Sequence, residues 1–579
     1  MGLVIMPTGY KQGKIDIGWW QTQIESGIEF RKDFSHEQKW PTWRQYYRGR
    51  WKGDVLPANI YFKMIRTVVP RIYFRNPSVS LVSTKPGLEN MLLAQLLERI
   101  DNKLIRQMKL KKQMKKIAQD AFMFGTGIGK MGYGAQFTPS PTQLDNSAPD
   151  KGGKNKVEYN QIVTPNMPWF LRTHPGAFIV PTGCMDFDDA RFCIHYIRRP
   201  LLDVKADERF DKTARAKLQA GSGNKGTMVS SKPGTNKTDK VFEEMVDLYE
   251  IRDKKNGTVS VIAPYVLSDK ALYEGPDELQ YNGRVPFHTV TFNEDDEVFW
   301  GVPDSQILEP LQLELNENMT QIMKHRRLSL IKLLAKKNAL SSAQAAKLVD
   351  KSILPYIEMD GDPLTDIKWV EGNNIPQDLF IAKQNTTMEV RETVGFSRNE
   401  FGEYKEGSGD TTATEAMIVR QASEIRVDER RDMMADMFVG IMEDVNHIIF
   451  NHWNEEQVID IMGPNGVPVW VRFKPEMLKG LIFEYNVDPD TSVPETKKIR
   501  QQNAQMVFQQ LNGDPLIDQV QLRRYFLHEH HGTVFDTMLK VPAGLPGSAQ
   551  VPMDLNDVVN MFQQGKGPKG VPSPASGGA

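Results

Sequence analysis

The feature that most constrains the fold is a helical pattern of about forty residues in the second half of the chain. It opens at 412–415, where Thr-Ala-Thr-Glu has the spacing of a capping box that satisfies the first free N–H groups of a helix. Apolar residues then recur at helical spacing as far as about Trp453. They are Ile418, Ala422, Ile425, Met434, Met437, Phe438, Ile441, Val445 and Ile448. Such a helix spans about 60 Å, more than a small domain, so we expect it to cross between domains or between subunits.

Other helices are predicted by the same apolar periodicity. Residues 88–124 read as one long helix with a stripe of leucines and a strongly basic middle. A second helix runs from Ser305 to about Lys337, and a third starts after Pro376. Two more are expected near the C-terminal end, at 495–511 and 516–530.

The first half of the chain carries short strand-like segments between turn-forming residues. Two stretches rich in Gly, Pro, Ser, Asn and Lys, at 138–158 and 213–240, read as exposed loops. The strand-like segments are Phe178–Pro181, Phe192–Ile197, Met245–Ile251, Val259–Val266 and Val285–Phe292. The fold class is therefore predicted to be α+β and predominantly helical.

Composition excludes several classes of protein. The 579 residues hold 72 Lys and Arg against 73 Asp and Glu, so a protein that coats nucleic acid through its overall field is disfavoured. Two cysteines cannot crosslink a chain of this length, which fits a reducing compartment or indifference to redox conditions. Because no apolar run approaches the length of a transmembrane helix, we expect a soluble, intracellular, multidomain protein with no membrane partner.

Two local basic segments leave alternatives open. Residues 1–80 hold 13 Lys and Arg against 6 Asp and Glu, and Arg and aromatic residues alternate at 43–51. This pattern suits stacking on bases, but the helical spacing of Trp40, Trp43, Tyr47 and Trp51 favours an aromatic face packed in a core. The basic run at 99–116 is either a solvated helix face or a contact for a polyanion or an acidic neighbouring subunit.

The motifs that suggest enzymes fail on their physical requirements. Gly127, Gly129 and Gly132 satisfy G-x-G-x-x-G, but a phosphate site needs a strand before the glycines and a helix after them. Here a helix precedes them and a strand-like segment follows, and Phe124 and Met131 break the P-loop pattern. A glycine-rich turn from helix to strand is the favoured interpretation.

Metal-ligating residues are present but lack the spacing of known sites. The Cys184, Cys193 and His195 set, with His174 nearby, matches no common zinc pattern, so two buried thiols are favoured. The other candidates, which lack the zinc and calcium spacings respectively, are His528–His531 and the acidic residues Asp186, Asp188 and Asp189. We therefore predict no catalytic residues, no metal and no cofactor.

The order of features resembles the portal (head-to-tail connector) proteins of tailed bacteriophages, particularly the short-tailed, podovirus-like type. Four places carry the resemblance, each loose alone but specific in their order and spacing. They are the segment Asn59–Pro77 ending in Arg-Asn-Pro, the basic helix running into Asp120–Gly127, the segment Gly301–Asn318, and a glycine-rich loop followed by Thr411–Ala416.

The resemblance implies a ring of twelve subunits at one capsid vertex, with a central channel for double-stranded DNA during packaging and ejection. It also implies domains, which are a wing at 1–302 and 413–485, stem helices at 303–337 and 376–393, a clip at 338–375, a channel loop at 394–412, a crown at 486–540 and a flexible tail at 541–579. The implied partners are the terminase large subunit, major capsid and scaffolding proteins, and tail or adaptor proteins. The implied location is the virion, after assembly in the host cytoplasm.

The resemblance also implies which charged residues face DNA. In the channel loop they are Arg398, Glu400, Glu403, Lys405 and Glu406. With Asp410 the loop has a small acidic excess, which suits a weak, sliding contact, since strong phosphate binding would stall translocation. The basic residues expected at the lower stem are Lys324, Arg326, Arg327 and Lys332. These cations either meet DNA or acidic clip residues, or form ordinary salt bridges between subunits.

Two functions from other classes remain as alternatives. One is a nucleotide-dependent DNA enzyme that uses the glycines at 125–134. The other is a cytoplasmic scaffold that binds RNA through its basic, aromatic N-terminal segment. The leading interpretation is a non-enzymatic channel, with packaging powered by a separate ATPase.

Overall fold

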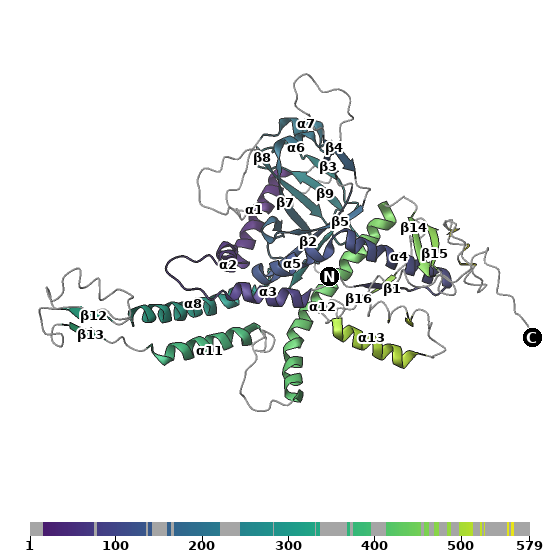
Figure 1. Cartoon of the computed structure of the whole chain (residues 1–579). Coiled ribbons are helices and arrows are strands. Elements are labelled where there is room, and N and C mark those ends of the chain that lie inside the picture. Colours follow the sequence, from purple (N-terminus) through teal and green to yellow (C-terminus); the bar gives the residue numbers. More distant parts are fainter. Residues whose placement is uncertain are drawn as a thin grey trace, which may run out of the picture. The chain divides into compact units, whose positions relative to one another are not determined.

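The computed structural model divides the chain into two compact units (Figure 1). The first, here called the sheet unit, comprises 1–38, 67–303 and 425–579, and the second, the helix-pair unit, comprises 39–66 and 304–424. The structure describes residues 16–73, 78–134, 137–141, 159–163, 167–219, 244–281, 283–329, 332–335, 367–370, 375–394, 413–452, 457–462, 468–473, 483–487 and 497–512, and short pieces at 522–523, 526, 553–554, 557 and 559–560.

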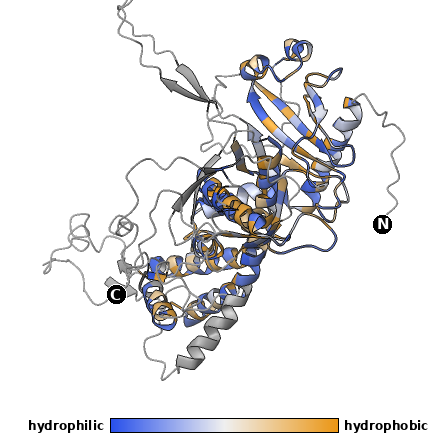
Figure 2. Cartoon of the chain, turned by 90° about the vertical axis from the view of Figure 1, so that its right-hand side faces the viewer, coloured by the Kyte–Doolittle hydropathy of each residue, from blue (hydrophilic) through white to orange (hydrophobic). Residues whose placement is uncertain are grey.

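A five-stranded antiparallel sheet forms the centre of the sheet unit. Its strands in spatial order are β10 (Tyr273–Pro276), β9 (Thr258–Ile262), β8 (Met245–Asp253), β7 (Phe192–Pro200) and β6 (Phe178–Ile179). Figure 2 shows both hydrophobic and hydrophilic residues on the strands of this unit, and along the central strand β8 every residue after Met245 is buried, so both faces of the sheet are covered there. Helix α1 (Ile17–Phe34) buries Trp20, Ile24 and Ile28 in the same apolar cluster as Ile194 of β7.

A second, three-stranded sheet has the order β11-β2-β5, formed by Phe287–Thr291, Thr126–Gly134 and Met167–Thr173. Helix α5 (Leu110–Phe124) covers it, and Ile117 of α5 lies over the glycines of β2. A Cβ atom on Gly129 would lie 2.1 Å from Phe170 Cζ, so the close approach of helix and ring requires glycine there.

The remaining elements of the sheet unit surround these two sheets. Helix α4 is buried along Leu93, Leu96, Leu97 and Ile100, beside the pair of strands β1 and β16. The bounds are α4 (Leu88–Gln107), β1 (Val79–Ser83), β16 (Phe483–Val487), β3 (Phe137–Pro141), β4 (Tyr159–Val163), η2 (Pro175–Ala177), α6 (Leu201–Ala206), α7 (Lys212–Lys217), β14 (Gln457–Met462), β15 (Pro468–Phe473), α13 (Lys497–Leu511) and β17 (Met553–Asp554).

The helix-pair unit is built on two long helices, α8 (Asp304–Leu328) and α11 (Gln377–Val394). Short strands β12 (Lys332–Ala335) and β13 (Ile367–Val370) pair with each other in antiparallel register. The unit also holds η1 (Glu37–Lys39) in part, α2 (Trp40–Tyr47) and the first turns of α3 (Ile60–Ile72). Helices α3 and α12 (Ala413–His452) each contribute to both units.

Most of the predicted elements are confirmed, and the α+β class with them. Helix α12 spans 40 residues, and the apolar residues predicted between Met434 and Ile448 are all buried. The strand-like segments of the first half become β6 to β9 and β11. The packed interpretation of the N-terminal aromatic residues is confirmed for Trp40 and Trp43, which are 0% and 1% exposed, whereas Trp51 lies beyond the end of α2 and is partly exposed.

Two helix predictions are wrong in their bounds. The helix predicted over 88–124 is two helices, because Lys109 adopts a left-handed conformation (φ 53°) that starts a new helix direction at α5. The helix predicted to reach about Lys337 ends at Leu328, and Lys332 lies on strand β12, paired with Val370. Within the described part of the chain, no helix combines the length and apolar character needed to span a membrane.

Candidate functional site

The α8–α11 pair is the described part of the predicted stem. The two helices pack along each other within the helix-pair unit (Figure 1). Leu308, Leu315 and Met323 of α8 are buried, as is Val390 of α11. The pair therefore has an apolar seam typical of packed helices.

A polar ladder on α8 fixes the extended segment 56–60 to the helix. Gln312, Asn316 and Thr320 recur at every fourth position, are 0%, 3% and 8% exposed, and accept hydrogen bonds from successive alternate N–H groups of that segment. The donor–acceptor distances are 2.8 Å from Ile60 N to Gln312 Oε1 and 3.0 Å for the other two, from Ala58 N and Leu56 N. The three side chains thus supply acceptors for main-chain donors of this segment, and Ile60 N also donates to the Ala58 carbonyl oxygen at 2.8 Å.

The C-terminal end of α8 is basic and exposed. Lys324, Arg326 and Arg327, three of the predicted stem residues, lie in its last turns together with His325. Arg327 Nη1 lies 3.4 Å from Asp54 Oδ2, but both side chains are more than half exposed. In the part of the chain that the structure describes, Lys324 and Arg326 have no ion-pair partner. Cations favour the negative end of the helix dipole, and this cluster remains available to an anionic partner.

The predicted channel-loop residues Arg398, Glu400, Glu403, Lys405 and Glu406 lie outside the described residues. The side chain of Lys332 is also outside them. The structure describes the helices on either side of the loop, with α11 ending at Val394 and α12 beginning at Ala413.

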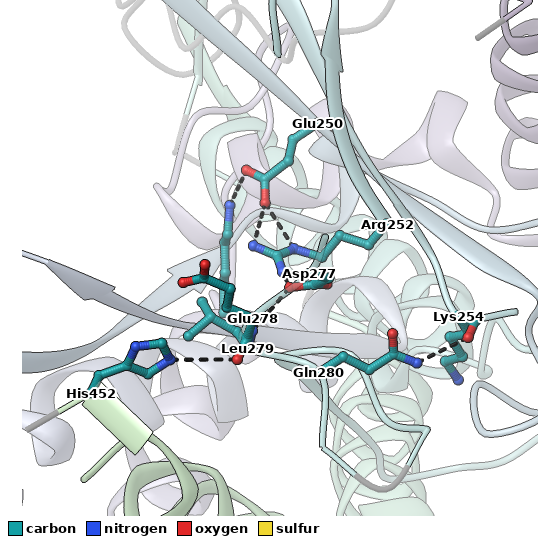
Figure 3. A network of polar contacts seen from close by, with 9 residues as sticks. Glu250, Arg252, Lys254, Asp277, Glu278, Leu279, Gln280 and His452 are labelled. Carbon is teal, nitrogen blue, oxygen red and sulfur yellow. Dashed lines mark hydrogen bonds and ion pairs between the residues drawn. The ribbon is translucent and has the colours of Figure 1, made fainter. Parts of the chain in front are cut away.

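A buried ion network lies in the sheet unit (Figure 3). Glu250 of β8 pairs with Lys130 of β2, and its other oxygen lies 2.9 Å from Arg252 Nη2. Arg252 in turn pairs with Asp277, which follows β10. The four side chains are 3% to 10% exposed, so the charges are satisfied by one another rather than by water. The network joins the two sheets of this unit.

Burial and charge shift the pKa values of this network in physically consistent directions. Burial would raise the pKa of Glu250, but Lys130 and Arg252 outweigh it and lower that pKa below its usual range. Burial lowers the pKa of Lys130, which Glu250 partly offsets. Burial and the nearby Lys130 charge lower the pKa of His195 to about 3, and its Nδ1 lies 3.4 Å from Lys130 Nζ. His195 is therefore neutral at neutral pH and accepts from the lysine.

Helix α12 is held to the sheet unit by polar contacts along its C-terminal half. Asp444 Oδ2 lies 2.9 Å from His288 Nε2 on β11, and Asn446 Nδ2 donates to Asp101 Oδ2 on α4 at 3.0 Å. At the end of the helix His452 stacks on Tyr133 of β2, and its Nε2 lies 3.5 Å from the Glu278 carbonyl oxygen (Figure 3). These contacts fix the helix in register against both sheets.

The glycine motif is a turn into a buried strand, as predicted. Gly125 ends α5 with φ 90°, and a Cβ atom there would lie 1.9 Å from the Gly301 carbonyl oxygen. Gly129 and Gly132 lie on β2 against the rings of Phe170 and Trp169. This geometry differs from a phosphate loop, in which the glycines lead into a helix N-terminus.

The two cysteines are buried free thiols, also as predicted. Burial raises the pKa of Cys184 to about 11 and that of Cys193 to about 12, which keeps both thiols protonated. Among the described residues, no group of three or more His, Cys, Asp or Glu side chains is arranged to hold a metal ion.

Two polar clusters that support the fold were not predicted from the sequence. The i, i+4, i+8 spacing of Gln312, Asn316 and Thr320 was a usable signal, because polar residues at that spacing share one helix face. The ion network had no such signal, since Lys130, Glu250 and Asp277 come from separate strands and turns.

Comparison with known proteins identifies the class and then the family. The match is to phage portal proteins, which are structural components of the capsid, and the matching family model is that of the phage SU10 portal protein. It covers residues 64–526, well over half of the chain, so the chain belongs to this family. The resemblance noted in the sequence is thereby confirmed. A comparison with curated proteins finds no match.

Proposed function

We propose that this chain assembles as a ring, of twelve subunits, at one vertex of the capsid and forms the conduit for double-stranded DNA. In this role the ring docks the terminase motor during packaging and tail or adaptor proteins afterwards, and contacts major capsid and scaffolding proteins. Assembly takes place in the host cytoplasm and the product is part of the virion. The observation that carries the proposal is the family match over residues 64–526.

The arrangement of helices supports a channel role. We assign the segment 394–412 as the channel loop, which begins at Val394, the last residue of α11, and is followed by α12. Helices α8 and α11 are assigned to the stem and the segment 338–375 to the clip. Most of the residues assigned to the wing belong to the sheet unit, which also includes the segment 486–540, assigned to the crown.

The charge pattern suits a conduit for DNA. The assigned channel loop has two cations, Arg398 and Lys405, against the carboxylates Glu400, Glu403, Glu406 and Asp410. A slightly acidic loop contacts the phosphates weakly, so DNA slides rather than binds. The exposed cations at the end of α8 supply a local contact for phosphates without a net positive field.

Electron microscopy of the purified full chain tests the assembly. We expect rings of about a dozen subunits with a central hole wide enough for a duplex. A compact monomer at every concentration would contradict the proposal.

As a matched test of the loop, Glu400, Glu403 and Glu406 are changed to Gln, which should slow DNA translocation at low salt. The exposed changes Asp203→Asn/Glu208→Gln/Glu274→Gln, which remove the same charge, serve as the control and should leave translocation unchanged.

A further inference from the structure

A cleft of about 430 Å³ in the sheet unit runs along the outer edge of strand β11. All five residues of the strand, Phe287–Thr291, border the cleft. Successive side chains of a strand point to opposite faces of its sheet, so a cleft bordered by every residue lies at the strand's edge rather than on one face. Its other walls come from residues 185–188, from 294–299 in part, and from α12.

The edge of β11 is free within the described part of the sheet. β11 is the outermost strand of the order β11-β2-β5 and pairs only with β2. In an antiparallel pair, every second residue of a strand exchanges main-chain hydrogen bonds with the neighbouring strand. Met131 N donates to Pro286 O at 2.9 Å, so Pro286 is one of these residues. The next ones along β11 are His288 and Val290, whose main-chain groups therefore point toward β2. The main-chain groups of Thr289 and Thr291 consequently point away from β2, toward the cleft. No described residue hydrogen-bonds to them.

The walls of the cleft carry an excess of carboxylates. The acidic residues are Asp186, Asp188, Glu294, Asp295 and Asp436, against the cations Lys254 and Arg284. Both cations are engaged within the chain. Lys254 Nζ donates to the carbonyl oxygens of Phe187 and Asp188, and Arg284 Nη2 lies 2.8 Å from Glu443 Oε2. The carboxylates of Asp188, Glu294 and Asp436 are exposed and have no ion pair with any described residue.

Methionine side chains add an adaptable apolar surface to the same cleft. Met185 is 66% exposed at its border, and Met433 and Met437 face it from α12. Flexible thioethers accommodate apolar side chains of different shapes. A ligand of this cleft therefore has main-chain donors and acceptors, positive charge and some apolar side chains.

We propose that the β11 cleft binds an extended, lysine- or arginine-bearing segment of a partner protein, which adds as a strand to the edge of β11. A free edge selects an extended peptide, because only that conformation matches the spacing of the outward N–H and C=O groups. The acidic walls select a cationic peptide and disfavour nucleic acid. This inference does not depend on the ring or on the channel.

Fluorescence anisotropy on the purified full chain tests the proposal. The probe is a fluorescein-labelled synthetic peptide of alternating Lys and Val, and the control peptide has the same sequence with every amide N-methylated. We expect only the first to bind, since the second keeps the charge but has no main-chain N–H donors. The variant Asp188→Asn/Glu294→Gln/Asp436→Asn should weaken binding about tenfold at low salt, whereas Asp203→Asn/Glu208→Gln/Glu274→Gln, an equal charge change elsewhere, should not.

Three results would overturn the proposal. Equal binding of the N-methylated peptide would show that charge alone acts, and equal binding by both triple variants would place the contact elsewhere. Binding to the monomer but not to an assembled ring would show that a second copy of this chain covers the edge. The absence of peptide binding to any form would also contradict the proposal.

Discussion

Two groups of charged residues in this chain have similar chemistry and opposite surroundings. In the sheet unit, Lys130, Glu250, Arg252 and Asp277 are at most 10% exposed and neutralise one another. In the helix-pair unit, the cations at the end of α8 are exposed, and the one described ion pair among them, Arg327 with Asp54, is itself open to solvent. The charges of the first group interact with one another, and those of the second group are exposed to solvent.

This difference separates charges that support the fold from charges that can serve a partner. Removing one member of a buried network destabilises the fold, because the charge of its partner stays buried with neither water nor a counterion. Exposed cations contribute little to stability, since water and salt screen them. Substitutions should therefore affect folding in the first group and binding in the second.

The largest effect is expected from Glu250→Ala. The change leaves Lys130 buried beside Arg252 with no carboxylate between them, and should lower the free energy of unfolding by about 3–5 kcal/mol. Chemical denaturation followed by circular dichroism measures the loss. The exposed change Glu274→Ala on β10 is the control, and a comparable loss there would show that the network has no special role.

A smaller effect is expected from Asn316→Ala in the polar ladder. The substitution removes the acceptor for Ala58 N and for Gln312 Nε2, so a main-chain donor loses its partner at a cost of about 1–3 kcal/mol. Thermal denaturation and hydrogen exchange at residues 56–60 report the change. The neighbouring exposed change Glu317→Ala should have almost no effect, and equal losses in both variants would argue against the ladder.

The protonation of His195 gives the network a dependence on pH. Its pKa is lowered to about 3 in the folded chain, so the unfolded chain binds the extra proton between about pH 6.5 and 3. The stabilisation that depends on neutral His195 is fully present above about pH 6.5. It is lost as the pH falls, so that the free energy of unfolding is lower by about 1–2 kcal/mol at pH 5.

His195→Gln keeps a hydrogen-bond acceptor for Lys130 but does not titrate. The free energy of unfolding of this variant should therefore fall less steeply with pH than that of the unmodified protein. Denaturation curves at several pH values between 7 and 5 compare the two proteins. Parallel curves would show that His195 is not the group responsible.

Features that depend on residues close together in the sequence were predicted, whereas features that depend on contacts between distant residues were not. Helix α12 was predicted almost to the residue because a capping box and a single apolar stripe are local signals. The break at Lys109 was missed, since a lysine gives no local signal for the left-handed conformation that it adopts there. The network of Lys130, Glu250 and Asp277 could not be predicted at all, because it depends on how distant strands are ordered and registered.

The smallest effect on stability, and the sharpest on binding, is expected from Lys324→Ala/Arg326→Ala/Arg327→Ala. All three side chains are exposed, so the free energy of unfolding should change by no more than about 0.5 kcal/mol. If the cations contact phosphates, each lost contact makes the negative slope of log affinity for duplex DNA against log salt less steep by about 0.9. The control Lys205→Ala/Lys212→Ala/Lys255→Ala removes equal charge from exposed sites of the sheet unit. Equal slopes in the two variants, together with weaker assembly of the first, would assign these cations to salt bridges between subunits instead of to DNA.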